Sequence, residues 1–149
     1  MRRRHLLVAV AATALFLCPA PGFADLDEVR KDTDLQRRSR KALENADAAL
    51  NRARQAYRQG DGEALDRSFS EIAESVELSY QSLVERGDNP RRNAGPYKRG
   101  ELSTKQLLRR LAAFRDEMSY MDRDRIDPVI ERVDKVHSEF LRDVMGGRQ

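Results

Sequence analysis

The sequence predicts an all-α protein of two helical hairpins, most simply packed as an up-down-up-down four-helix bundle. Apolar residues of the 149-residue chain recur at steps of three and four instead of alternating, which is the spacing of a buried helix face. Four such stripes follow one another, separated by glycine and proline at positions where helices commonly end. Two of the three connections between the stripes are short, which favours antiparallel neighbours.

Residues 1–24 have the three-part layout of a secretory signal peptide. Arg2–Arg4 form a basic start, residues 6–18 form an uncharged and mostly apolar run, and residues 19–24 supply helix breakers and small residues. The run is short for a membrane span, so we expect cleavage after residue 24 and an exported product, periplasmic or secreted, without a stable span. Retention of the leader as an anchor is the alternative. Cleavage removes Cys18, the only cysteine, and with it any disulfide or thiolate metal site.

The first hairpin is expected to begin at about residue 33, in a helical domain that covers residues 33–146. Thr33–Gln36 has the pattern of a capping box, and Gly60 and Asp61 are expected to end the first helix and cap the second. Residues 25–32 contain few apolar side chains and are expected to form a flexible or frayed tail. The stripe of the first helix is Leu43, Ala46, Leu50, Ala53 and Tyr57, and that of the second is Leu65, Phe69, Ile72, Val76, Tyr80 and Leu83.

The second hairpin is expected to begin at a second capping box, Ser103–Gln106. Asp127 and Pro128 predict the start of the last helix, so residues 121–127 are a turn, or a kink if the last two helices are continuous. Residues 147–149 are expected to form a C-terminal tail. The stripe of the third helix is Leu107, Leu111, Phe114, Met118 and Met121, and that of the fourth is Ile126, Val129, Val133, Val136, Phe140 and Val144.

Residue types that carry catalysis or bind metals are sparse after residue 24. His137 follows Asp134 by one helical turn, but a di-iron bundle needs such a unit twice, with glutamates. The serines of residues 68–82 lack a nucleophile elbow, and no phosphate loop or dinucleotide fingerprint is present. The turn-spaced acidic row at residues 71–77 is typical of a solvated helix face. We therefore expect a non-enzyme without metal or cofactor.

Charge is segregated along the chain, although cleavage of the leader would leave equal numbers of acidic and basic residues. Residues 61–86 carry seven acids and two bases, whereas residues 87–110 carry seven bases and two acids. The basic segment includes Gly87–Glu101, which predicts a long loop, and functional residues often lie on such loops. An Arg/Lys group with one aromatic residue is suited to a phosphate, carboxylate or sugar acid. The candidate ligand-binding residues are Arg91, Arg92, Tyr97, Lys98 and Arg99.

A competing hypothesis gives these bases a purely structural role. They would pair with acids of the second helix and tie the loop to the bundle. The acids expected to take part are Glu71, Glu74, Glu77 and Glu85. Nucleic acid is not expected as a partner, because the compartment is wrong and the usual binding motifs are absent.

A set of residues in the C-terminal half forms a further pattern: Asn89–Arg91, Lys98, Leu107–Leu111, Met118 and Asp122–Arg123. With these residues, the C-terminal half resembles a family of uncharacterised, predicted-secreted bacterial helical proteins. The resemblance implies a helical fold and export, and it brings no activity and no functional residue with it.

Together these observations predict an exported, non-enzymatic binding module. The basic region 86–110 would contact an anionic envelope component or an envelope protein. The alternative is a periplasmic chaperone or stress-type adaptor, with Phe114, Met118 and Met121 on an exposed apolar surface. The stripes are compatible with a monomer or a dimer, so the oligomeric state is left open.

Overall fold

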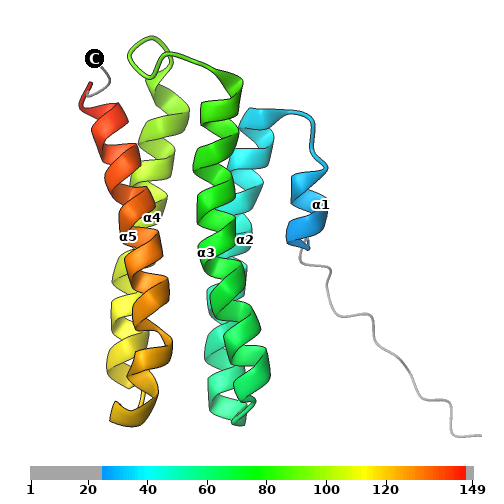
Figure 1. The fold of residues 1–149 in the computed structure, drawn as a ribbon, viewed down its shortest axis with the longest axis vertical. Coiled ribbons are helices and arrows are strands. Elements are labelled where there is room, and N and C mark those ends of the chain that lie inside the picture. The colour runs from blue at the N-terminus through cyan, green and yellow to red at the C-terminus, as the bar shows by residue number, and fades with distance from the viewer. Residues whose placement is uncertain (1–24, 147–149) are drawn as a thin grey trace, which may run out of the picture.

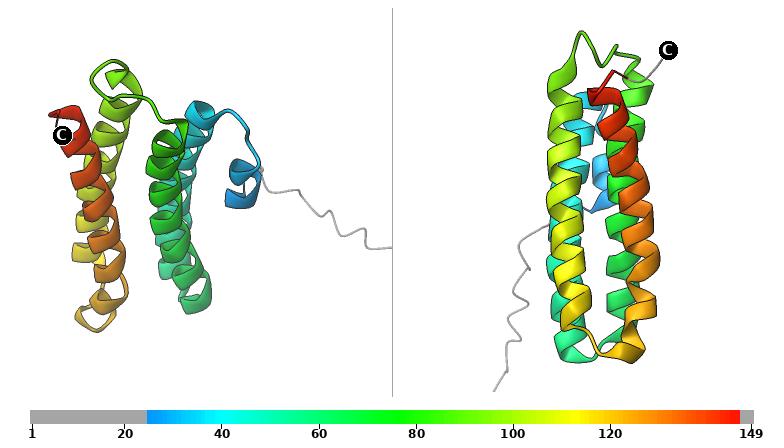
Figure 2. Two further views of the ribbon diagram at one scale, coloured as in Figure 1. Left: turned by 45° about the horizontal axis from the view of Figure 1, so that its top comes forward. Right: turned by 90° about the vertical axis from the view of Figure 1, so that its left-hand side faces the viewer.

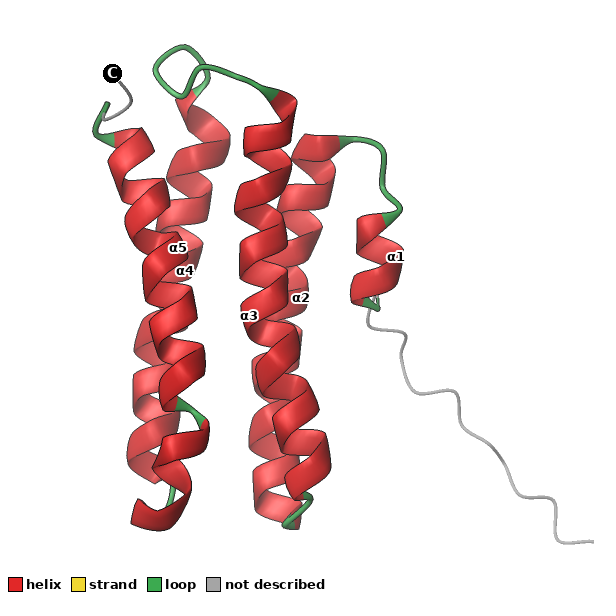
Figure 3. Cartoon of the chain, viewed as in Figure 1, coloured by secondary structure: helices red, strands yellow, loops and turns green. Residues whose placement is uncertain are grey.

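The computed structural model describes residues 25–146, which are helical with no strand (Figure 3). The predicted all-α class is therefore confirmed for these residues. The signal peptide predicted at residues 1–24 and the tail predicted at 147–149 lie outside them. The elements are α1 (Leu26–Arg30), α2 (Leu35–Gln59), α3 (Gly62–Arg86), α4 (Ala94–Glu117), the 3-10 helix η1 (Tyr120–Arg125) and α5 (Asp127–Val144).

The four long helices form two antiparallel hairpins, α2–α3 and α4–α5, that lie side by side (Figure 1). In Figure 2, α4 lies against α2 and α5 lies against α3. Helices α2 and α4 run parallel to each other. Asp47 of α2 forms an ion pair with Arg110 of α4, and Arg54, further along α2, forms one with Glu117, further along α4. Residues 87–93 therefore connect α3 to the helix diagonally across from it, over one end of the molecule.

Small residues line the interface between α2 and α3 and let these helices approach closely. Several serines of α3 are satisfied inside this interface. Ser79 Oγ lies 2.9 Å from Ser39 Oγ, and Ser75 Oγ accepts a hydrogen bond from Asn45 Nδ2 at 2.9 Å. The Ser68 hydroxyl donates to a backbone carbonyl one turn earlier. The buried serines of this segment, Ser68, Ser75, Ser79 and Ser82, are therefore packing residues, whereas Ser70 is exposed. The buried alanines of α2 are Ala42, Ala46, Ala49, Ala53 and Ala56.

Helix α1 replaces the tail that was expected at residues 25–32. Leu26 and Val29 lie one turn apart, and both are buried against Ala42 of α2. Arg30 Nη2 lies 2.9 Å from Glu74 Oε2 of α3, which ties the end of α1 to the same hairpin. Two apolar residues make too short a stripe to predict a helix, and it is the contact with the hairpin that stabilises α1.

The helix ends agree with the prediction from the sequence at the turn between α2 and α3, and they differ from it at the starts of α2 and α5. Gly60 adopts a left-handed conformation with φ 69°, and the Asp61 side chain caps α3, as predicted. The N-cap of α2 is Asp34, so the prediction of Thr33 is wrong by one residue. Ile126 occupies the N-cap position of α5, and Asp127 is instead paired with an arginine of α4. The α4–α5 connection is a turn with two separate helices.

The long loop predicted at Gly87–Glu101 is wrong, because α4 already begins at Ala94. Pro96 lies in the first turn, where a missing N–H costs nothing, and Gly100 is helical and buried. The capping box predicted at Ser103–Gln106 is therefore inside α4. The Thr104 hydroxyl donates to the carbonyl of Gly100 at 2.8 Å, which is the bond of a threonine in a helix interior.

The predicted apolar stripes form the core, apart from their ends. Phe114 and Phe140 are the largest fully buried side chains. Tyr80 contacts Phe140 edge-to-face with ring centroids 5.1 Å apart, which joins α3 to α5. Met121 is 83% exposed and was wrongly placed in the stripe of the third helix.

Candidate functional site

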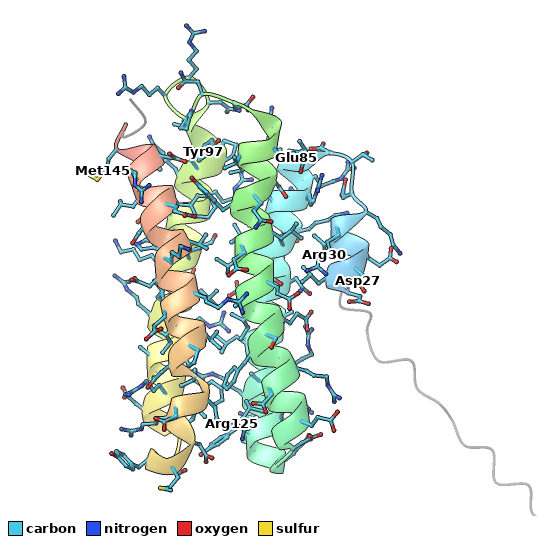
Figure 4. The ribbon with its side chains drawn as sticks, viewed as in Figure 1. Asp27, Arg30, Glu85, Tyr97, Arg125 and Met145 are labelled. Atoms are coloured by element: carbon cyan, nitrogen blue, oxygen red, sulfur yellow. The ribbon has the colours of Figure 1, made fainter. Side chains whose placement is uncertain are left out.

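Tyr97 is not part of an exposed cluster. Its side chain is only 2% exposed, near the end of the molecule where residues 87–93 connect α3 to α4 (Figure 4). Its hydroxyl donates to the carbonyl oxygens of Leu83 at 3.3 Å and Asp88 at 3.4 Å. Tyr97 therefore fixes the start of α4 to the end of α3.

Arg86 and Arg91 also hold the connection in place. Arg86 Nε lies 3.1 Å from a carboxylate oxygen of Asp88, and its Nη1 donates to Gln36 at the start of α2. Arg91 Nη2 donates to the carbonyl oxygen of Gly146 at 2.6 Å, just after α5. These two guanidinium groups tie the loop to α2 and to the end of α5.

The remaining three predicted residues, Arg92, Lys98 and Arg99, are exposed and form no ion pair within residues 25–146. The same holds for Lys105 and Arg109, which were not among the five predicted residues. Four of these bases lie on α4. We name Lys98, Arg99, Lys105 and Arg109 the α4 basic face.

Three of the four residues of the α4 basic face follow one side of the helix, and Arg99 lies beside them toward α2. Lys98, Lys105 and Arg109 are separated by seven and four residues, which brings their side chains to the same side. Leu102 lies between them and is 62% exposed, the one large hydrophobic side chain of α4 that is exposed. The face thus combines a row of cations with a single apolar side chain.

The hypothesis that the acids of α3 neutralise the basic region is wrong for the described residues. Each of these acids is paired with an arginine from another part of the chain. The pairs are Glu71 with Arg52 at 2.8 Å, Glu74 with Arg30 at 2.9 Å, Glu77 with Arg132 at 2.8 Å and Glu85 with Arg38 at 3.4 Å. Helices α1, α2 and α5 supply these partners, so none of these four acids pairs with the α4 basic face.

His137 of α5 is half-buried and lies against α4. Its Nδ1 is 2.9 Å from Thr104 Oγ1. Because the Thr104 hydroxyl donates to a carbonyl of its own helix, we infer that His137 Nδ1 carries the proton and donates to Thr104. His137 thus joins the two helices. Within residues 25–146, no group of three or more His, Cys, Asp or Glu side chains is placed to hold a metal ion.

A groove of about 530 Å³ runs between α3 and α5. Tyr80, Val84 and Val136 give it apolar walls, and Glu77 and Glu139 lie among its acidic residues. The Tyr80 hydroxyl donates to a buried carboxylate oxygen of α5 at 3.0 Å. Lys135 also lines the groove, and Glu77 and Glu85 are paired with arginines, so the groove has mixed charge.

Among the helices of residues 25–146, none combines the length and the apolar character that a membrane crossing requires. Comparison with known protein families, with curated proteins and with solved structures finds no match to this chain. The resemblance noted from the sequence stays a prediction.

Lys105 and Arg109 could have been included in the site from the sequence. The spacing of Lys98, Leu102, Lys105 and Arg109 is helical, but it becomes visible only if the helix is started before residue 98. The assumption of a loop up to residue 101 hid this pattern.

Proposed function

We propose that this protein is an exported, non-enzymatic binding module whose two hairpins form a four-helix bundle. Its α4 basic face would bind an anionic component of the bacterial envelope or an acidic envelope protein. The observation that carries the proposal is the row of exposed cations that lacks carboxylate partners within the described residues, although the acids of α3 lie nearby in the sequence.

The charges of the α4 basic face are suited to attract a partner because none of these bases forms an ion pair within the described residues. An exposed ion pair within the protein contributes little to stability, typically about 0–1 kcal/mol, so leaving four cations unpaired costs little. The same cations act over a distance of about 8 Å at physiological ionic strength. The binding would therefore be sensitive to salt.

The roles of the polar side chains described above support the proposal that the protein is not an enzyme. Ser75 and Ser79 of α3 form hydrogen bonds inside the interface with α2, and His137 joins α4 to α5. None of them is aimed, with a base or an acid beside it, at the hollows described here. We therefore assign the function to surface recognition.

The test compares two triple variants with equal loss of charge. The first is Lys98→Ala, Lys105→Ala and Arg109→Ala on the α4 basic face. The control is Arg58→Ala, Lys135→Ala and Arg142→Ala, three exposed bases that also lack an ion pair within residues 25–146. Tagged proteins are used to capture partners from envelope extract at low and high salt, and circular dichroism checks that helicity is retained.

We expect the α4 variant to lose most of the capture seen at low salt and the control to retain it. High salt should weaken capture by the unchanged protein. Equal capture by both variants would contradict the proposal, as would capture that resists salt.

A periplasmic chaperone or stress-type adaptor is a second candidate. Phe114 and Met118, which were expected on its apolar surface, are only 1% and 3% exposed, so that surface is not formed as expected. Tyr120 and Met121 of η1, each 83% exposed, are the observation that favours this candidate. Replacing both with Ser should abolish suppression of client aggregation if it is correct, whereas Ala substitutions on α4 should not.

A further inference from the structure

A polar hollow of about 310 Å³ lies where the start of α2 faces the first turns of α4. Three of its five lining residues are arginines, contributed by two helices. The lining residues are Asp34, Gln36, Arg37, Arg40 and Arg99. Arg99 belongs to the α4 basic face, so the hollow is continuous with the surface that we propose as the binding face.

Two of the three guanidinium groups are available to a ligand. Arg99 forms no ion pair within the described residues. The partner of Arg40 is Glu44, one turn along the same helix, at 3.8 Å, and both side chains are more than half exposed. Such a pair is weak and is easily exchanged for a better anion.

The third guanidinium group is held by the protein. Arg37 donates from Nε and Nη2 to the two carboxylate oxygens of Asp32, both at 2.6 Å. Hydrogen bonds from Arg37 and then Lys41 hold the pKa of Asp32 well below its usual range. Arg37 is thereby fixed at the wall of the hollow, whereas Arg40 has only its weak pair with Glu44 and Arg99 has no ion pair within the described residues.

The single carboxylate of the hollow is already engaged. Asp34 Oδ1 accepts from the backbone N–H of Arg37 at 3.0 Å, as the cap of α2, and this bond lowers the pKa of Asp34. The ion-pair partner of Asp34 is Arg37, at 3.9 Å, and within the described residues Asp34 forms no ion pair with Arg40 or Arg99. The Gln36 carbonyl accepts from Arg86, so its amide N–H groups remain as donors.

We propose that this hollow binds a phosphate group, held between Arg40 of α2 and Arg99 of α4. Each guanidinium group can offer two parallel N–H donors to two oxygens of an anion. A carboxylate has only two oxygens and is satisfied by one such fork. A tetrahedral phosphate presents further oxygens in other directions, so it can accept from two arginines that approach from different helices.

The proposal deepens the proposed function and rests on it, since it names the chemistry of the anion bound at the same surface. The phosphate could belong to a lipid headgroup or to a soluble phosphate ester. The other cations of the α4 basic face would attract either source without contacting the phosphate in the hollow.

The test measures binding of inorganic phosphate to the full chain by calorimetry, at low salt. Arg40→Ala with Arg99→Ala is compared with Lys105→Ala plus Arg109→Ala, which removes the same charge outside the hollow. We expect the first pair of substitutions to weaken phosphate binding about tenfold or more, because two charge-assisted contacts are lost. We expect the second pair to change it by about twofold or less.

A second comparison looks for tighter binding. Asp34→Asn removes the acidic charge from the hollow but keeps a good N-cap, since Asn and Asp are equivalent there. Phosphate should bind several-fold more tightly to this variant and not to Asp116→Asn, which neutralises an exposed acid elsewhere on α4. No saturable phosphate binding at millimolar concentration, or equal effects of the paired variants, would overturn the proposal.

Vesicles then distinguish the two sources. The source is a lipid phosphate if phosphatidylglycerol vesicles bind the unchanged chain and the variant Arg40→Ala with Arg99→Ala binds them more weakly than the control variant does. If only soluble phosphate shows that difference, the source is a phosphate ester. Salt-sensitive envelope capture that needs Lys98, Lys105 and Arg109 but not the hollow would leave the proposed function standing and remove this inference.

Discussion

Replacing Gly100 with Ala tests how closely α4 and α5 pack. A Cβ atom on Gly100 would lie 2.3 Å from Cε1 of Phe140, and 2.5 and 2.6 Å from its Cζ and Cδ1. Ordinary contacts between carbon atoms are about 3.5–4.0 Å. All three clashing atoms belong to one ring that is fully buried and packed edge-to-face on Tyr80, so the ring has little room to move.

Two opposing effects set the magnitude. Alanine is favoured over glycine inside a helix by about 1 kcal/mol, and the backbone of Gly100 has no positive φ that would require glycine. Overpacking a well-filled core costs about 1–3 kcal/mol, and the short distances at Phe140 place this case at the upper end. We therefore expect Gly100→Ala to lower the free energy of unfolding by about 1–2 kcal/mol.

Urea unfolding followed by circular dichroism measures this change, and Gly95→Ala is the matched control. Gly95 lies on the same helix, but no heavy atom would be within 4 Å of its new Cβ. This control should be unchanged or up to about 1 kcal/mol more stable. The double variant Gly100→Ala with Phe140→Leu should lose less unfolding free energy than the two single variants lose together, because the smaller side chain relieves the clash. The reasoning is refuted if Gly100→Ala is as stable as Gly95→Ala.

Three further predictions concern other parts of the molecule. Because the folded state lowers the pKa of Asp32, its ionised form stabilises the fold above pH 3.8, its ordinary value, and this contribution is lost as the pH falls. Urea titrations should therefore find Asp32→Asn less stable than the unchanged protein at pH 7. This difference in unfolding free energy should shrink as the pH falls below 3.8, and a difference that stays constant contradicts the assignment. Val29→Ala should detach α1, seen as faster amide exchange in residues 26–30 while α2 stays protected, and uniform exchange across both helices would contradict this. Tyr97→Phe should cost about 1 kcal/mol of stability and leave phosphate binding unchanged, since the side chain is buried and its hydroxyl donates to the backbone carbonyls of Leu83 and Asp88; a loss of binding would restore Tyr97 to the site.

The sequence was sufficient for the features that depend on local periodicity. Each stripe of step three and four became a buried helix face, because such a stripe must be buried whatever lies opposite it. Gly60 and Asp61 were also predictable, since a left-handed glycine followed by an acidic cap is a local arrangement.

Features that depend on contacts between distant segments could not be predicted. Gly100 resembles a loop residue in the sequence, but it is a helical residue that makes room for Phe140, forty positions away. The same holds for α1, whose two apolar residues are buried only because Ala42 and α3 lie opposite them.

The candidate site divides in the same way. The concentration of bases after residue 86 was visible, but their partners were not, because ion pairs form across helices whose positions the sequence does not give. The acids of α3 form ion pairs with arginines of α1, α2 and α5, and the Tyr97 side chain is buried. Of the five predicted residues, Arg92, Lys98 and Arg99 are exposed without an ion pair in the described part of the chain, and Lys105 and Arg109 join them.

The most direct test of the central claim is the capture of envelope components at low salt. The comparison is between Lys98→Ala, Lys105→Ala and Arg109→Ala on α4 and the charge-matched control at Arg58, Lys135 and Arg142. The account predicts that the α4 variant alone loses its partner while both variants keep their helicity. Capture that survives in the α4 variant, or that is lost equally in the control, would contradict the assignment of binding to this face.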